Sequence, residues 1–181
     1  MTRDDITNYS VIERLRNGRS VTIRTIRPHD TDLVAAGLRR VSPESLYHRT
    51  FSARKTFNDK EIARLVNIDL ERIVALVAVM QEAGQDLIVG EGRYVRLGGT
   101  EGTVAEVAFL VDDERKGQGV GTLLFRHLAA IARSAGVAQF VAAVLAQNKV
   151  MLHLFDRSGL KVTKTRDEDT VRVTIDLRAP E

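Results

Sequence analysis

The chain has 181 residues, the size of one domain, and its 44% hydrophobic content can bury a core, which excludes a wholly disordered protein. Its 27 Lys and Arg residues against 24 Asp and Glu residues leave a net charge of +3, too small and too dispersed to indicate a nucleic-acid-binding protein. Cysteine is absent, which excludes disulfide scaffolds, zinc sites built on thiolates and cysteine nucleophiles.

The N-terminal segment is polar and charged. It reads MTRDDITNYSVIERL and has no apolar stretch of the kind found in secretory signals, and no apolar run in the chain approaches the length of a membrane span. We therefore expect a cytoplasmic protein with no membrane partner. Residues 1–18 are predicted to form a short helical N-terminal arm ending at an Asn17-Gly18 turn, and residues 19–181 the main domain.

Strand and helix signals alternate in the first half of the main domain. Residues 21–27 alternate apolar and polar side chains, which predicts a strand closed by Pro28. Three helices are then predicted from their N-terminal signals, which are Asp30 as a cap, Ser42 followed by Pro43, and the capping-box pair Asn58 and Glu61.

Three strands in succession are predicted next. Residues 73–80, IVALVAVM, are continuously apolar, as in a strand buried on both faces. Strands at 88–97 and 103–111 are separated only by the glycine-rich tract 98–102, so they are expected to be antiparallel neighbours. A helix opened by the turn at 117–121 and ended by Gly136 is followed by a strand at 140–145, a helix at 148–157 and a hairpin of 161–165 with 171–177. This order predicts a mixed α/β (α+β) fold with a mainly antiparallel sheet and one strand–helix–strand crossover.

The strongest local motif is the glycine cluster KGQGVGT between a strand and a helix, residues 116–122. Glycines let backbone N–H groups converge, and the helix N-terminus adds partial positive charge, so the cluster predicts a pyrophosphate site, with Arg115 and Lys116 as nearby cations. The spacing fits neither a Walker A loop nor the dinucleotide fingerprint. The alternative is a tight turn that only starts a helix.

Two motifs together resemble the GNAT superfamily of acyl-CoA-dependent N-acetyltransferases. The family's CoA loop, Gln/Arg-x-x-Gly-x-Gly/Ala, is matched by Lys116 to Gly121, with Lys in first place. The family's second motif, Asn-x-x-Ala-x-x-Leu-Tyr-x-x-x-Gly-Phe, is in register from Asn148 to Leu160, with Phe155 in place of the tyrosine. The resemblance covers about residues 20–178 and implies a GNAT fold: a central twisted, mainly antiparallel sheet with one parallel splayed strand pair, and helices on both faces.

The N-terminal half is similar to one subgroup, the acetyltransferase domain of bacterial Pat-type protein lysine acetyltransferases. The similar segments are IRTIRPHD, VSPESLYHRTFS and NDKEIARLVNIDLERIVALVAV, and the subgroup's usual Arg-Phe-Phe is here Arg49-Thr50-Phe51. This resemblance implies acetyl-CoA as co-substrate and a protein lysine as acceptor. A small-molecule amine acceptor and a non-catalytic acyl-CoA-binding sensor are the alternatives.

Glu106 is the predicted catalytic residue. It interrupts TVAEVAFLV, where burial would raise the pKa of its carboxyl group toward the range of a general base. A hairpin folded about Gly99 and Thr100 would place Tyr94 opposite Glu106, with Arg93 and Arg96 nearby. A structural Glu–Tyr or Glu–Arg pair is therefore the other interpretation. In Pat-like domains a glutamate on this strand is the proposed base, and the resemblance favours catalysis.

The resemblance also implies how acetyl-CoA binds. Backbone groups of the strand contact the pantetheine arm, the glycine loop holds the pyrophosphate, and an asparagine contacts CoA from the other side. The implied CoA-binding residues are Phe109, Leu110, Val111, Lys116, Gly117, Gln118, Gly119, Val120, Gly121, Thr122 and Asn148. The four histidines lie in different segments without ligand spacing, so no metal is expected. The acceptor and the oligomeric state, including a homodimer, remain open.

Overall fold

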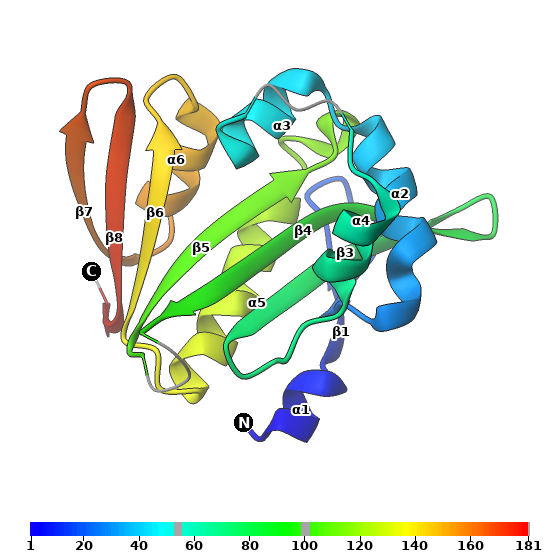
Figure 1. Ribbon diagram of the computed structural model, residues 1–181, viewed down its shortest axis with the longest axis horizontal. Helices are drawn as coiled ribbons and strands as arrows, with labels where there is room; N and C mark the ends of the chain where they lie inside the picture. Colours follow the sequence, from blue (N-terminus) through cyan, green and yellow to red (C-terminus); the bar gives the residue numbers. More distant parts are fainter. Residues whose placement is uncertain (53–55, 99–101, 181) are drawn as a thin grey trace.

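The computed structural model describes residues 1–52, 56–98 and 102–180, and its centre is one 8-stranded sheet with strand order β1-β2-β3-β4-β5-β6-β8-β7 (Figure 1). The strands are β1 (Ser10–Arg14), β2 (Ser20–Thr25), β3 (Ile73–Glu82), β4 (Gln85–Leu97), β5 (Val104–Val111), β6 (Gln139–Leu145), β7 (Leu160–Asp167) and β8 (Thr170–Pro180). The helices are α1 (Arg3–Thr7), α2 (Thr31–Arg40), α3 (Pro43–Thr50), α4 (Asp59–Val66), α5 (Val120–Ser134) and α6 (Lys149–Asp156), with short 3₁₀ turns η1 (Pro28–Asp30) and η2 (Asp113–Arg115).

Every strand pair is antiparallel except β5 with β6, which is parallel. The connection between these two strands is α5, as the crossover rule requires for parallel neighbours. Helix α5 covers one face of the sheet, and α2 and α4 cover the other (Figure 1). The predicted mixed fold with helices on both faces is confirmed.

The predicted helical arm is wrong for most of its length. Only Arg3–Thr7 is helical, and Ser10–Arg14 forms the edge strand β1, which pairs with β2. All five β1 residues are exposed or only half-buried, so the strand carries no apolar alternation by which it could be recognised. Ile6 and Leu15, on either side of it, are buried in the main core.

Most helix starts form as predicted. The Ser42 side chain accepts a hydrogen bond from the Ser45 N–H, and Asn58 forms the predicted reciprocal capping box with Glu61. Asp30 precedes α2 but does not cap it. Its buried carboxylate instead accepts two hydrogen bonds from the Arg24 guanidinium, at 2.7 and 2.8 Å. The predicted turn at Gly99–Thr100 lies outside the described residues.

The core is divided by the sheet. The larger cluster, on the α5 side, includes an aromatic group in which Phe155 packs against Phe109 and Phe125. The smaller cluster lies under α2 and α4. The larger core fixes α5 against the sheet, and so fixes the position of the glycine loop at its N-terminus.

Candidate active site

The parallel strands β5 and β6 separate after a short contact. They pair only at Val104 with Gln139, Ala105 with Phe140, and Glu106 with Val141. Beyond Glu106 the two strands diverge, and α3 lies above the opening (Figure 1). The edge of β5 that faces β6 therefore has no strand partner from Val107 onward. The backbone N–H and C=O groups on that edge make no hydrogen bonds to β6.

The glycine loop follows β5 and leads into α5. Gly117 and Gly119 have positive φ angles of 76° and 97°, a conformation that glycine adopts without steric cost. At Gly121 glycine is favoured by packing and not by a positive φ angle, since a Cβ there would lie 2.9 Å from Leu154 Cδ1 of α6. The cluster thus combines two turn glycines with one that permits close packing of α5 and α6.

The N-terminus of α5 has no side-chain cap from the described residues. The first N–H groups of a helix lack intrahelical partners and carry partial positive charge. No acidic side chain lies in the first turn of α5 to neutralise that charge. This end of the helix is therefore suited to an anionic group such as a phosphate.

A cleft of about 710 Å³ joins the strand opening to the glycine loop. Its walls include ten of the predicted CoA-binding residues, which are Phe109, Leu110, Val111, Lys116, Gly117, Gly119, Val120, Gly121, Thr122 and Asn148. Gln118 is the predicted residue that does not line it, because its side chain bonds to Asn17 and to the Glu114 carbonyl. Asn148 caps α6 by accepting a hydrogen bond from the Met151 N–H, which leaves its amide NH₂ as a donor.

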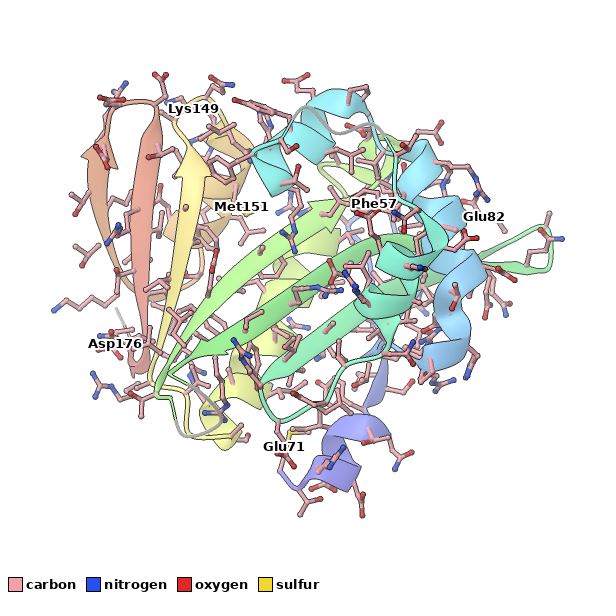
Figure 2. The ribbon with its side chains drawn as sticks, in the orientation of Figure 1. Phe57, Glu71, Glu82, Lys149, Met151 and Asp176 are labelled. Atoms are coloured by element: carbon pink, nitrogen blue, oxygen red, sulfur yellow. The ribbon has the colours of Figure 1, made fainter. Side chains whose placement is uncertain are left out.

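Several cleft residues were not among the predicted CoA-binding residues. They are Arg16 from the β1–β2 turn, Glu44, Ser45 and His48 from α3, and Lys149, Met151, His153, Leu154 and Arg157 from the region of α6. Figure 2 shows Met151 between β6 and α3, and Lys149 near the tips of β6 and β8. The residues near α6 lie within the second family motif, but no local motif marks Arg16 or the α3 residues, which reach the cleft only because the fold brings distant chain segments together.

Glu106 lies at the last paired position before the strands separate. It is exposed, so the predicted burial of its carboxylate is wrong. Its partner on β4 is Val95, one residue from the predicted Tyr94, and a one-residue shift places Tyr94 on the opposite face, where it is buried. Arg93 pairs with Glu91, and Arg96 bonds only to backbone carbonyls among the described residues, so neither predicted structural pair forms.

The two predicted cations beside the loop are already paired with carboxylates. Arg115 donates to Glu82 at 2.6 Å, and Lys116 pairs with Asp113 while also donating to Ser45 Oγ at 2.6 Å. Lys149 and Arg157 form no ion pair within the described part of the chain. The cleft thus keeps positive charge at the α6 end as well as at the helix N-terminus, as an anionic ligand requires.

Asp113 joins α3 to the loop. Its carboxylate accepts hydrogen bonds from the Ser42 N–H at 2.7 Å, the Ser45 hydroxyl at 2.8 Å and the Lys116 ammonium. Partial burial would raise the pKa of Asp113, but these hydrogen bonds outweigh it and lower the pKa to about 2. Helix α3 is therefore fixed over the cleft by a charged residue two positions after the end of β5.

Phe155 is fully buried and does not line the cleft. Among the described residues, no group of three or more His, Cys, Asp and Glu side chains has the arrangement needed to hold a metal ion. Within the same residues, no helix is both long and apolar enough to cross a membrane.

Comparison with known proteins identifies several relatives. The model of the acetyltransferase (GNAT) family matches residues 42–160. An acetyltransferase of Pseudomonas aeruginosa is 30% identical over 159 residues, which cover 88% of this chain and 84% of that protein. Acetyltransferase Pat of Mycolicibacterium smegmatis is 34% identical over 146 residues, which cover 81% of this chain and 43% of that protein.

The fold is also similar to a solved structure of the Pat type. The crystal structure of the GNAT domain of S. lividans PAT superimposes with a TM-score of 0.83 at 31% identity, covering 92% of this chain and 96% of that one. Glu106, the glycine loop and Asn148 all lie within the residues that match the family model.

Proposed function

Because the chain belongs to the GNAT acetyltransferase family, and so uses acetyl-CoA as co-substrate, we propose that it transfers the acetyl group to a lysine side chain of a protein, with Glu106 as general base. The observation that carries the proposal is the position of Glu106. It lies where β5 and β6 begin to separate, on the same strand as the cleft residues Phe109 and Leu110.

The cleft fits acetyl-CoA in shape and charge. In this proposal the glycine loop and the N-terminus of α5 bind the diphosphate, and the free edge of β5 binds the pantetheine arm by backbone hydrogen bonds. The thioester then lies beside Phe109 and Leu110, where a backbone N–H stabilises the oxyanion. Asn148 contributes its amide NH₂ from the α6 side.

The reaction is a direct acyl transfer. The acceptor ammonium, with an ordinary pKa near 10.4, loses a proton to Glu106, and its nitrogen attacks the thioester carbon. Phe109 lies three positions beyond Glu106, about 10 Å along an extended strand, so a chain of water molecules relays the proton. The C–S bond then breaks, and the nitrogen gives its second proton to water as the amide forms. The CoA thiolate takes a proton from water, since Phe155 has no proton to give and does not line the cleft.

The surroundings of Glu106 favour a protein acceptor over a small amine. Glu106 is exposed and does not itself line the 710 Å³ cleft. A small substrate usually needs an enclosed site that buries most of its surface. A lysine on a protein surface needs only an accessible base, and the Pat-type resemblance implies the same acceptor.

The test is thiol release from acetyl-CoA by wild type, Glu106→Gln and Glu44→Gln, with acetyl-CoA synthetase protein and a panel of small amines as acceptors. Glu44→Gln is the matched control, because Glu44 is the one carboxylate lining the cleft within the described residues. We expect Glu106→Gln to lose about 100-fold in kcat, the lower part of the usual range for a general base, and to bind CoA normally. Turnover only with small amines would reject the lysine acceptor, and a full rate in Glu106→Gln would reject the base.

A further inference from the structure

The turn between β1 and β2 lies directly against the glycine loop. The Arg16 N–H donates to the Gln118 carbonyl at 3.1 Å, and Asn17 Nδ2 donates to Gln118 Oε1 at 3.1 Å. Leu15, the preceding residue, is buried in the main core and holds the turn in place. These contacts join segments that are 101 positions apart in the sequence.

The Arg16 side chain extends along the loop toward the cleft. Its Nη1 donates to the Gly117 carbonyl at 3.2 Å. Its stem passes over Gly119, where a Cβ would lie 3.6 Å from Arg16 Cγ. Arg16 is also one of the residues that line the cleft. The guanidinium is therefore held beside the N-terminus of α5.

Arg16 differs in its partners from the two cations that the motif itself supplies. Arg115 pairs with Glu82, which also pairs with Arg19, and Lys116 pairs with Asp113. Arg16 forms no ion pair within the described part of the chain, and a guanidinium has five N–H donors, so a single bond to a carbonyl leaves most of them free. A planar guanidinium with free donors matches the oxygens of a phosphate.

Holding the loop does not require this guanidinium. The backbone N–H of Arg16 and the Asn17 amide already tie the turn to Gln118. The Arg16 guanidinium therefore has no carboxylate partner in the described structure, and it lies beside the part of the cleft that best suits an anion.

We propose that Arg16 binds the diphosphate of the acyl donor, so that the β1–β2 turn forms part of the acetyl-CoA site. This rests on the proposed function only in taking the cleft as the donor site. It assigns a binding role to a residue outside the segment that matches the family model, residues 42–160.

The test compares two donors, acetyl-CoA and S-acetylpantetheine, which lacks both the diphosphate and the nucleotide. Arg16→Ala is expected to raise KM for acetyl-CoA about tenfold, the size expected for one charged hydrogen bond. It is expected to leave kcat/KM for S-acetylpantetheine unchanged. Arg14→Ala is the matched control, because Arg14 donates to the Gly18 carbonyl in the same turn and does not line the cleft.

An equal loss with both donors would show that Arg16 only supports the loop, and no loss with acetyl-CoA would show that it does not bind phosphate. Either result overturns the proposal. Calorimetric binding of CoA and pantetheine to wild type and Arg16→Ala keeps this test separate from the proposed function. Weaker binding of CoA alone supports the Arg16 role even where no acceptor is turned over.

Discussion

The Asp113→Asn substitution tests whether one carboxylate holds α3 over the cleft. In the folded protein the pKa of Asp113 falls from 3.8 to about 2, because hydrogen bonds from Lys116, Ser42 and Ser45 outweigh the effect of burial. Since one pKa unit corresponds to 1.36 kcal/mol, the charged form contributes about 2 kcal/mol to stability at neutral pH. The side chain is 30% exposed, so solvent screens only part of this contribution.

We expect Asp113→Asn to lower the free energy of unfolding by about 2 kcal/mol at pH 7, or Tm by roughly 4 to 8 °C for a domain of this size. Urea unfolding followed by circular dichroism measures the change. Glu114→Gln is the control, because Glu114 is the exposed neighbour on η2 and its side chain forms no ion pair in the described structure. It is expected to match wild type within about 0.5 kcal/mol.

The pH dependence gives a second readout with a defined sign. A carboxyl group whose pKa is lowered by folding stabilises the protein above its unfolded pKa, and this stabilisation is lost as the pH falls through the folded pKa. For Asp113 that interval runs from about 4 down to about 2. The difference between wild type and Asp113→Asn should therefore shrink to roughly half at pH 3. A difference below 0.5 kcal/mol at pH 7, or one that does not change with pH, would refute the reasoning.

Two further predictions concern buried groups. Phe155→Ala removes a fully buried ring that packs against Phe109 and Phe125, and is expected to lower the free energy of unfolding, measured in urea, by about 3–5 kcal/mol. A decrease of less than about 1 kcal/mol would contradict the packing of this aromatic core. Asp30→Asn leaves the buried Arg24 guanidinium without its counter-ion and is expected to lower the free energy of unfolding by about 3–5 kcal/mol. The control is Asp32→Asn at an exposed position, which should change the free energy of unfolding by no more than about 0.5 kcal/mol.

Features that depend on a few neighbouring residues could be predicted from the sequence. The Asn58–Glu61 capping box, the Ser42 cap and the apolar run of β3 all form as expected, because each signal and the structure it produces lie within the same short segment. The glycine loop belongs to this class as well, since positive φ angles at Gly117 and Gly119 are a local requirement of the turn.

Features that depend on pairing between distant segments were decided only by the tertiary structure. The edge strand β1 has no apolar alternation and exists because β2 pairs with it. The exposure of Glu106 follows from the register with Val95 and from the divergence of β5 and β6, neither of which a single strand encodes. Arg16 reaches the loop across 101 positions, because the sheet and the main core bring the β1–β2 turn to the N-terminus of α5. The sequence by itself determines which residues can form turns, cap helices or be buried in the core. The packing of the whole chain determines which charged side chains come together at the cleft.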